Sequence, residues 1–244
     1  MDAAAASQER SPVEICAGGE RLWLLPERAV WWPRRSTLLV ADLHLGKERA
    51  LLAEGVVAPE GVLQETLRRL SHLEALLQPA RVLVLGDLVH AASGLDAEVV
   101  ETVAAWRRGQ RAAWELIPGN HDANVPEVPP EWGITLRPEE VLEDGLLLRH
   151  DPRPDPRGMV WGGHLHPVVL LRGALDRMVL PCFLVGTARA VMPAFTRFSR
   201  GVRVEPEAGE RVYALAGGAV VEVDPSAGES RRSARAVWAA TMSR

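Results

Sequence analysis

Buried strands alternate with amphipathic helices over the first half of the chain. Continuous apolar runs at Thr37–Ala41, Arg81–Leu85 and Ala113–Ile117 predict strands that are buried on both faces. Between them, leucines recur at helical spacings through Pro59–Leu77, and a second helical pattern follows a capping aspartate through Asp96–Arg107. The order strand, helix, strand, helix, strand predicts a mostly parallel sheet with helices packed on it.

The pattern is different before and after this region. The segment Val13–Val30 predicts a short hairpin, and beyond Pro138 the apolar stretches are short and divided by Gly, Pro and Asp, which predicts a second, largely antiparallel sheet. Its strand candidates are Gly145–Arg149, Met159–Gly162, Val168–Leu171, Met178–Val185, Gly201–Val204, Arg211–Leu215 and Ala219–Val223. We expect residues 1–224 to form a single domain and 225–244 to form a mobile tail, in which Ala236–Met242 could be a short helix.

Composition narrows the class of protein. Hydrophobic residues make up 47% and charged residues 25%, as in an ordinary globular protein, and the net charge of −4 argues against a broad cationic surface that coats nucleic acid. No apolar run approaches the ~20 residues of a membrane span, and the N-terminus lacks the pattern of a secretory signal. Cys16 and Cys182 give no disulfide framework, so we expect a cytoplasmic protein in which both are small buried hydrophobic residues.

Histidines and aspartates gather in short motifs that follow predicted strands. The motifs are Asp42-Leu43-His44, Gly86-Asp87, Gly119-Asn120-His121-Asp122, His150-Asp151 and Gly163-His164-Leu165-His166. In an extended chain residues i and i+2 point to the same face, so Asp42 with His44, and His164 with His166, are each expected to present two ligands to one side. Open α/β sheets bind ligands beyond the carboxyl ends of their strands. The polar side chains are therefore expected to converge on one crevice.

This combination of residue types predicts a metal centre. A single DxH or HxH pair is more often a polar strand end than a pair of ligands. Burying so many titratable groups together is costly unless a positive charge pairs with them, and nitrogen and oxygen ligands without a thiolate suit Mn, Fe or Zn. The ligands are too many for one tetrahedral ion. Two ions about 3.5–4 Å apart, bridged by a carboxylate, would use them all, and such pairs catalyse hydrolytic phosphoryl transfer.

In these motifs the sequence resembles the calcineurin-like metallophosphoesterases, whose ordered pattern is DxH, GDxx, GNHD, a single His and GHxH. The resemblance spans about Leu39 to Pro167. More narrowly, the strings ADLHLGKE, LGDLVHA, GNHD and GHLHP are similar to those of the ligase-associated DNA damage response phosphoesterases, a bacterial branch that is associated with a helicase and a DNA ligase. The resemblance implies an α/β fold, specifically a four-layer α/β/β/α sandwich with two packed mixed sheets flanked by helices.

The resemblance also implies a role for each matching residue. The implied ligands are Asp42, His44 and His166 for the first ion, Asp87 as the bridge, and Asn120, His150 and His164 for the second ion. His121 would lie beside the scissile phosphate and stabilise or protonate the leaving oxygen, with Asp122 orienting its imidazole. The implied cofactors are two divalent ions, Mn²⁺ or else Fe or Zn, and the implied reaction is attack on phosphorus by a hydroxide that the ions activate.

Other polar residues near the motifs have two interpretations. Many relatives have an acidic residue three or four places after the aspartate of the GD block, whereas this chain has His90. His90 could be an additional ligand, but we expect it outside the ligand set, as an outer or surface histidine. His72 is expected to be exposed on its helix. Lys47 and Arg49 could receive a substrate phosphate, or could belong to a solvated helix start.

The leading hypothesis is a two-metal phosphodiesterase that acts on single-stranded nucleic acid in DNA repair, with a DNA ligase and a helicase as partners. One alternative is a small-molecule phosphoesterase that hydrolyses cyclic nucleotides, dinucleotides or phosphomonoesters with the same core. The other alternative is a metal-bound scaffold that binds a partner without catalysis. Such a scaffold would be expected to have lost ligands, and here all of the expected ligands are present.

Overall fold

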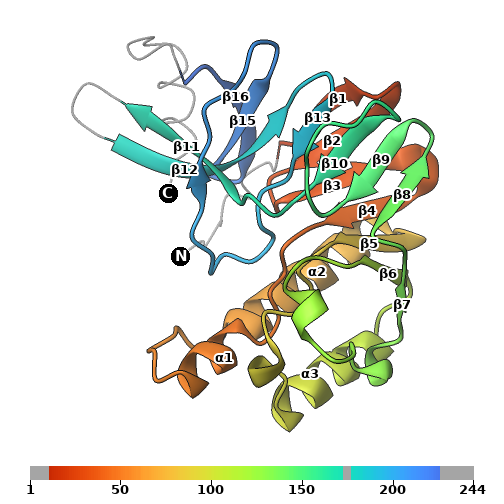
Figure 1. Cartoon of the computed structure of the whole chain (residues 1–244), viewed down its shortest axis with the longest axis vertical. Coiled ribbons are helices and arrows are strands. Elements are labelled where there is room, and N and C mark those ends of the chain that lie inside the picture. Colours follow the sequence, from red (N-terminus) through yellow and green to blue (C-terminus); the bar gives the residue numbers. More distant parts are fainter. Residues whose placement is uncertain (1–10, 173–176, 226–244) are drawn as a thin grey trace, which may run out of the picture.

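The computed structural model describes residues 11–172 and 177–225, and two β-sheets pack face to face within them (Figure 1). The first sheet contains seven strands in chain order. They are β1 Val13–Ala17, β2 Glu20–Leu25, β3 Ala29–Trp32, β4 Thr37–Val40, β5 Arg81–Leu85, β6 Ala113–Ile117 and β7 Ile134–Leu136. Strands β1 to β4 pair antiparallel, and β4 to β7 pair parallel, so the sheet is mixed.

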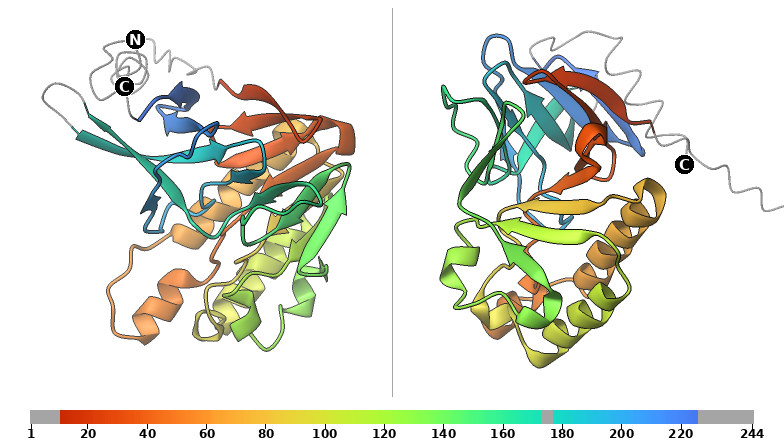
Figure 2. Two further views of the ribbon diagram at one scale, coloured as in Figure 1. Left: turned by 45° about the horizontal axis from the view of Figure 1, so that its top comes forward. Right: turned by 90° about the vertical axis from the view of Figure 1, so that its right-hand side faces the viewer.

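The α-helices lie together on one side of the two sheets (Figure 2). They are α1 Lys47–Ala53, α2 Val62–Leu77 and α3 Ala97–Arg108, and short 3-10 turns occur at Pro33–Arg35, Ala92–Gly94, Asp122–Asn124 and Pro130–Trp132. The leucine stripe of α2 is buried against β4, β5 and β6. The carboxylate of Asp96 accepts a hydrogen bond of 2.8 Å from the Val99 N–H and so caps α3.

The second sheet is built from the C-terminal half of the chain. Its strands are β8 Glu140–Glu143, β9 Leu146–Arg149, β10 Met159–Gly162, β11 Pro167–Arg172, β12 Arg177–Val185, β13 Arg189–Val191, β14 Val202–Arg203, β15 Arg211–Ala216 and β16 Ala219–Val223. The main path runs β14-β11-β12-β13-β10-β9-β8, and β15 pairs with β12 and β16. Five of the eight strand pairs are antiparallel, as expected. Parallel pairs of β10 with β9 and β13, and of β11 with β14, make the sheet mixed.

The main core lies between the sheets. Trp32 of the first sheet and Trp161, Phe183 and Tyr213 of the second are almost completely buried there. The indole N–H of Trp32 donates to the Glu20 carboxylate over 2.7 Å, so its polar atom is satisfied inside the core. Truncating an aromatic side chain in such a core costs about 3–5 kcal/mol. This packing fixes the relative position of the two sheet edges from which the polar motifs emerge.

The structure confirms the α/β class and the two packed mixed sheets. Three differences stand out. Val13–Val30 contains most of a three-stranded meander rather than a hairpin. The short elements α1, β7, β8 and β13 were not expected from the sequence. Over residues 11–172 and 177–225 no α-helix packs on the outer face of the second sheet, so the fourth layer of the expected sandwich is not found in this part of the chain. The expected tail helix Ala236–Met242 lies outside the described residues.

The two cysteines have different environments. Cys182 is fully buried, and burial raises the pKa of its thiol to about 12. Cys16 is exposed on β1, so the expectation that both are buried is wrong for this residue. Among the described residues, none of the helices combines the length and the apolar character that a membrane crossing requires.

Candidate metal centre

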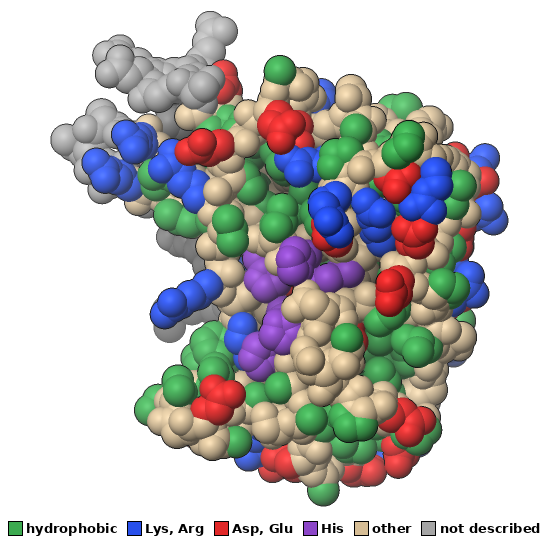
Figure 3. Space-filling view, in the orientation of Figure 1, with side chains coloured by type: hydrophobic (Ala, Val, Ile, Leu, Met, Phe, Trp, Pro, Cys, Tyr) green, Lys and Arg blue, Asp and Glu red, His purple; other side chains and the backbone are tan. Residues whose placement is uncertain are grey.

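The predicted ligands come from loops that leave the carboxyl ends of strands in both sheets. Those of the first sheet are Asp42 and His44 after β4, Asp87 after β5 and Asn120 after β6, and those of the second are His150 after β9 and His164 and His166 after β10. Backbone hydrogen bonds tie the loops together, from the Asp42 N–H to the Gly86 carbonyl and from the His44 N–H to the Asp87 carbonyl. Figure 3 shows the histidine side chains gathered on one face of the molecule.

The ligand atoms form two adjacent groups that share one carboxylate. One group contains Asp42, His44, Asp87 and His166, the other contains Asp87, His150 and His164, and within each group the ligand atoms lie within 4.8 Å of one another. The Oδ2 atom of Asp87 is 3.9 Å from Nε2 of His44 and 3.4 Å from Nε2 of His150. Oδ1 of Asn120 is 3.0 Å from the same His150 nitrogen and so joins the second group. All seven predicted ligands are therefore brought together.

The contacts within the groups fit divalent cations. Nε2 of His44 faces Nε2 of His166 at 3.3 Å, and Nδ1 of His164 faces Nε2 of His150 at 3.1 Å. The Asp42 side chain in the first group is completely buried. Facing imidazole nitrogens can share a hydrogen bond or a metal ion, and a cation stabilises the buried carboxylates beside them. This nitrogen and oxygen set without thiolates suits Mn, Fe or Zn. The clustered residues form a divalent-metal site.

Asp87 and His150 shift each other's pKa in opposite directions. Burial by itself would raise the pKa of the Asp87 carboxyl, but the hydrogen bond and charge of His150, with the His121 N–H, bring it down to about 2. Burial by itself would lower the pKa of His150, but Asp87, with smaller contributions from Asp42 and the Leu85 carbonyl, raises it to about 9. Burial lowers the pKa of His44 to about 2, so this ring stays neutral, which is the form that coordinates metal ions.

The ligand loops have a left-handed backbone. Asp42, His44, Asp87, His164 and His166 all have positive φ, between 46° and 67°. Such conformations are rare outside glycine and collect at functional sites, where the surrounding structure holds them. The expected extended geometry of the DxH and HxH pairs is therefore wrong. The two histidines of the HxH pair also separate, His166 to the first ligand group and His164 to the second.

Glycines in three of the motifs leave room for ligand side chains. A Cβ atom on Gly86 would lie 2.2 Å from Nδ1 of His150, one on Gly119 would lie 2.3 Å from Oδ1 of Asp87, and one on Gly163 would lie 2.3 Å from Oδ2 of Asp42. Real Cβ atoms do not come this close to other heavy atoms, because a close-packed interior leaves no room to relieve the steric repulsion. The glycine of each motif is thus required by the ligand of another motif.

We expect Gly163→Ala to lower metal affinity about 10- to 100-fold, the usual effect of disturbing the supports of a ligand. The added methyl group would meet the Asp42 carboxylate and the Ala41 Cβ, 2.6 Å away, so Asp42 must move. Titration of metal-depleted protein by calorimetry measures the change. Gly109→Ala is the matched control, since its Cβ would meet only the Trp106 carbonyl oxygen at 3.4 Å. Equal affinities in the two variants would show that Gly163 does not position Asp42.

His121 and Asp122 lie beside the ligands but differ in what they contact. Nδ1–H of His121 donates a hydrogen bond of 2.7 Å to the His90 carbonyl oxygen, so the carbonyl orients the imidazole. The Asp122 carboxylate instead accepts backbone N–H bonds from Leu88, Val89 and Gly119. The expectation that Asp122 orients the imidazole is therefore corrected. Asp122 ties the loop after β5 to the loop after β6, and these loops carry Asp87 and Asn120.

Sequence reasoning placed His90 outside the site, but the structure brings it in. Its ring stacks on His121 with centroids 4.8 Å apart, and its Nδ1 lies 3.3 Å from Nδ1 of His44. The sequence signal that could have placed His90 in the site is its position three residues after Asp87.

Of the two cations after the first motif, only Lys47 lies beside the centre. Its side chain is half-buried, with the ammonium 5.7 Å from the centre of the Phe198 ring. Burial is the larger cause of the lowered pKa of His90, and the charge of Lys47 lowers it further. Arg49 instead forms ion pairs with Asp96 and Glu98.

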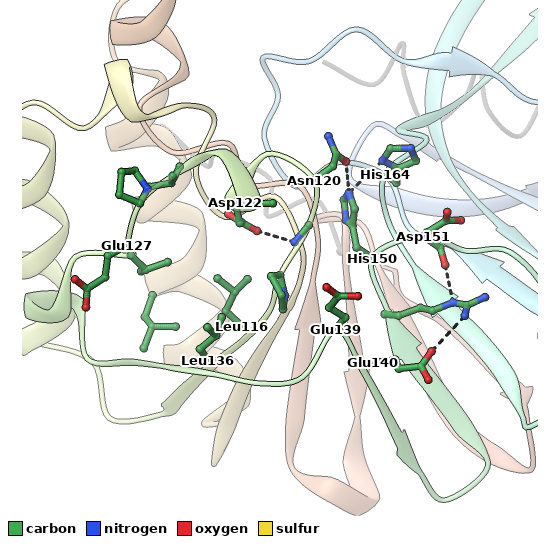
Figure 4. A pocket seen from close by; sticks show the side chains of 18 of the residues that line it. Leu116, Asn120, Asp122, Glu127, Leu136, Glu139, Glu140, His150, Asp151 and His164 are labelled. Carbon is green, nitrogen blue, oxygen red and sulfur yellow. Dashed lines mark hydrogen bonds and ion pairs between the residues drawn. The ribbon is translucent and has the colours of Figure 1, made fainter.

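A cleft of about 930 Å³ opens beside the second ligand group (Figure 4). Asn120, His150 and His164 line it at the metal centre. Its apolar wall includes Leu116, Val125, Ile134 and Leu136, and its polar wall includes Glu139, Glu140, Arg149 and Arg153. Arg149 is fixed there by a hydrogen bond to the Asp151 carbonyl and an ion pair with Glu140. The cleft can receive a molecule much larger than a phosphate ion.

A family model and one solved nuclease structure agree with this fold and its motifs. Residues 36–163, slightly more than half of the chain, match the family model of the calcineurin-like phosphoesterases. The crystal structure of the nuclease MPE of Pseudomonas putida is 34% identical in sequence, with a TM-score of 0.77, and the match covers 87% of this chain and 100% of that chain. The phosphoesterase Yfce of E. coli is 14% identical with a TM-score of 0.36, over 77% of this chain and 97% of that one.

The comparison with curated proteins gives no match. The family model includes the motifs from Asp42 to Gly163, and the Pseudomonas nuclease extends the similarity over both sheets. Five loops bring the predicted ligands to one centre; four of these loops supply their ligands from within the matched residues, and His164 and His166 directly follow them. Such a centre suits phosphoester hydrolysis by two metal ions. The chain therefore belongs to the calcineurin-like phosphoesterase family, whose members are hydrolases of phosphoester bonds.

Proposed function

We propose that the protein is a two-metal phosphodiesterase that cleaves single-stranded nucleic acid in DNA repair. The observation that carries this proposal is the pair of ligand groups sharing Asp87 at the end of an open cleft. Similarity to a nuclease at 34% identity over 87% of the chain supports nucleic acid as the substrate. The motif strings support the ligase-associated branch, and hence a DNA ligase and a helicase as partners. Two free cysteines fit a reducing cytoplasm.

Each residue of the centre has a proposed task. Asp42, His44 and His166 would hold one ion, Asn120, His150 and His164 would hold the other, and Asp87 would contact both. When bound, such ions neutralise phosphate charge and lower the pKa of coordinated water. We propose Mn²⁺ as the metal, since carboxylate, amide and imidazole ligands suit it, with Fe and Zn as the alternatives.

His121 is proposed to act on the leaving oxygen. Because Nδ1 of its ring is engaged by the His90 carbonyl, Nε2 is the atom free to contact substrate. With Nδ1–H donating to that carbonyl, a proton at Nε2 is the second proton of an imidazolium, and it would stabilise or neutralise the developing charge on the leaving group. Lys47, half-buried beside the same histidines, is placed to attract a phosphate. Arg49 has no such role, because it is paired with Asp96 and Glu98.

The depth of the centre favours a flexible substrate. Asp87 and His44 are each only 2% exposed, whereas Asn120 and His164 are exposed where they line the cleft, so a scissile phosphate would reach the centre through that cleft. Duplex DNA is stiff over roughly 150 base pairs, and bending it into a recess costs several kcal/mol, whereas a single strand bends freely. The same cleft has an apolar wall on which bases can pack.

A substrate panel tests the proposal. Metal-depleted protein is reconstituted with Mn²⁺, Fe²⁺ or Zn²⁺ and given labelled single-stranded DNA, single-stranded RNA, duplex DNA, cyclic nucleotides and bis(p-nitrophenyl) phosphate. We expect cleavage of single strands, with Mn²⁺ the most effective ion, and complete loss of activity with a chelator. Turnover of the small substrates alone would identify a small-molecule phosphoesterase. Protein that binds its ions but hydrolyses none of the panel would be a scaffold.

A further inference from the structure

Four arginines near one end of the second sheet have no ion-pair partner among the residues that the structure describes. Arg172 and Arg177 lie at the far ends of β11 and β12, and Arg200 and Arg203 lie before and within β14. All four are exposed, and their guanidinium groups form no ion pair or hydrogen bond with any residue in 11–172 or 177–225. Elsewhere in this sheet arginines are paired, for example Arg189 of β13 with Glu210. The unpaired charges are therefore concentrated on one extension of the sheet.

Strand register places three of these arginines on the same face. Arg172 is directly opposite Arg177, and Arg203 is opposite Val168, which precedes Arg172 by an even number of residues on β11. Residues opposite each other point to the same side, as do alternate residues along a strand. The same side also presents Leu170 and its partner Val179, which is 61% exposed. We call this surface of β14, β11 and β12 the arginine face.

The arginine face begins at the metal centre. His166 immediately precedes β11, and its carbonyl oxygen accepts a hydrogen bond of 3.1 Å from the Val202 N–H of β14. Nδ1 of the His166 ring lies 3.3 Å from the Arg200 carbonyl oxygen. At ~3.3 Å per residue, β11 carries the face about 20 Å outward from His166 to Arg172. In Figure 3, Lys and Arg side chains lie over the β11–β12 hairpin and also beside the histidines.

The opposite side of the extension faces the protein. Val169 of β11 and Cys182 of β12 are buried there in an apolar cluster, with Leu171, Met178 and Leu180 packed against it. The arginines are thus held on a supported sheet surface, with fixed spacing along it. A net charge of −4 makes the protein as a whole repel polyanions, so a local row of cations is what could bring one to the centre.

We propose that the arginine face binds the sugar-phosphate backbone of the single strand whose scissile phosphate lies at the metal centre. Guanidinium groups match phosphate oxygens, and the apolar side chains of Leu170 and Val179 between them offer a surface for bases or sugars. This assignment rests on the proposed nucleic-acid substrate, and it adds the direction in which the strand leaves the centre.

Charge reversal at the far end of the face tests the assignment. In the holoenzyme, Arg172→Glu/Arg177→Glu should lower kcat/KM on a long single strand about tenfold at moderate salt, and it should reduce the slope of log(kcat/KM) against log[salt] by about 1.4. Hydrolysis of bis(p-nitrophenyl) phosphate and of a dinucleotide should not change, because neither reaches the hairpin. Arg172→Lys/Arg177→Lys should restore most of the activity on the long strand.

The control is Arg68→Glu/Arg111→Glu, which changes the net charge equally at two other exposed arginines, on α2 and at the amino end of β6. It should behave as the wild-type protein does. Equal losses in both double variants, or no loss in either, would overturn the arginine face while leaving the nuclease intact. Wild-type protein that hydrolyses the small diester and cleaves no nucleic acid would instead overturn the proposed function, and this assignment with it.

Discussion

Asp87→Asn is expected to reduce metal-dependent hydrolysis by about a thousandfold or more, because Asp87 is the only residue common to both ligand groups. Metal ions supply several kcal/mol of charge stabilisation to phosphoryl transfer, and about 4 kcal/mol corresponds to a thousandfold. The asparagine keeps Oδ1, which accepts the His121 N–H over 2.9 Å, so the loop that carries His121 remains anchored. Turnover of bis(p-nitrophenyl) phosphate and the metal content by mass spectrometry measure the effect.

Asp96→Asn is the control, because it makes the same chemical change at a helix cap where asparagine serves as well as aspartate. It should leave both rate and metal content unchanged. If Asp87→Asn had lost one equivalent of metal and retained the wild-type rate, a single ion would be sufficient for catalysis. If it retained both the rate and the metal, the observed hydrolysis would come from a contaminant or the ions would lie elsewhere.

Much of the centre could be predicted because its ligands follow strands with clear patterns. The strand before Asp87 begins and ends where the apolar run Arg81–Leu85 does, and the strand before Asn120 agrees equally well with Ala113–Ile117. Parallel neighbours end at a common edge, so sequence alone indicated that these side chains would meet. The short strands β7, β8 and β13 could not be predicted, because segments of three or four residues show no period.

The detailed geometry of the centre depended on tertiary contacts that no local pattern encodes. Left-handed φ at Asp42 and His44 follows from backbone hydrogen bonds to the loop after β5, which is distant in sequence. The position of His90 depends on the same loop, which the Asp122 carboxylate holds through the N–H groups of Leu88 and Val89. Asp122 thus acts on the centre through the backbone, whereas the resemblance to the family had implied a contact with the His121 imidazole.

His121→Ala is expected to lower kcat about 10²- to 10⁴-fold, the usual range for the loss of a general acid. Metal content should stay at the wild-type level, because the ring contacts the His90 carbonyl and the His44 ring and belongs to neither group that contains Asp87. Loss of a proton donor weakens catalysis most for poor leaving groups. The deficit should therefore be large for single-stranded DNA and much smaller for bis(p-nitrophenyl) phosphate, whose leaving group needs little protonation.

The dependence on the leaving group distinguishes an acid from a structural residue. His72→Ala, on the exposed side of α2, is the matched control and should leave both substrates unaffected. If His121→Ala slowed both substrates equally and also lost metal, the ring would serve to hold an ion. His44, His90 and His121 form a further group whose ring nitrogens lie close enough together to do so. If His121→Ala slowed both substrates equally and metal were retained, His121 would stabilise charge on the phosphoryl oxygens rather than on the leaving oxygen. Its contribution would then not depend on how well the leaving group departs.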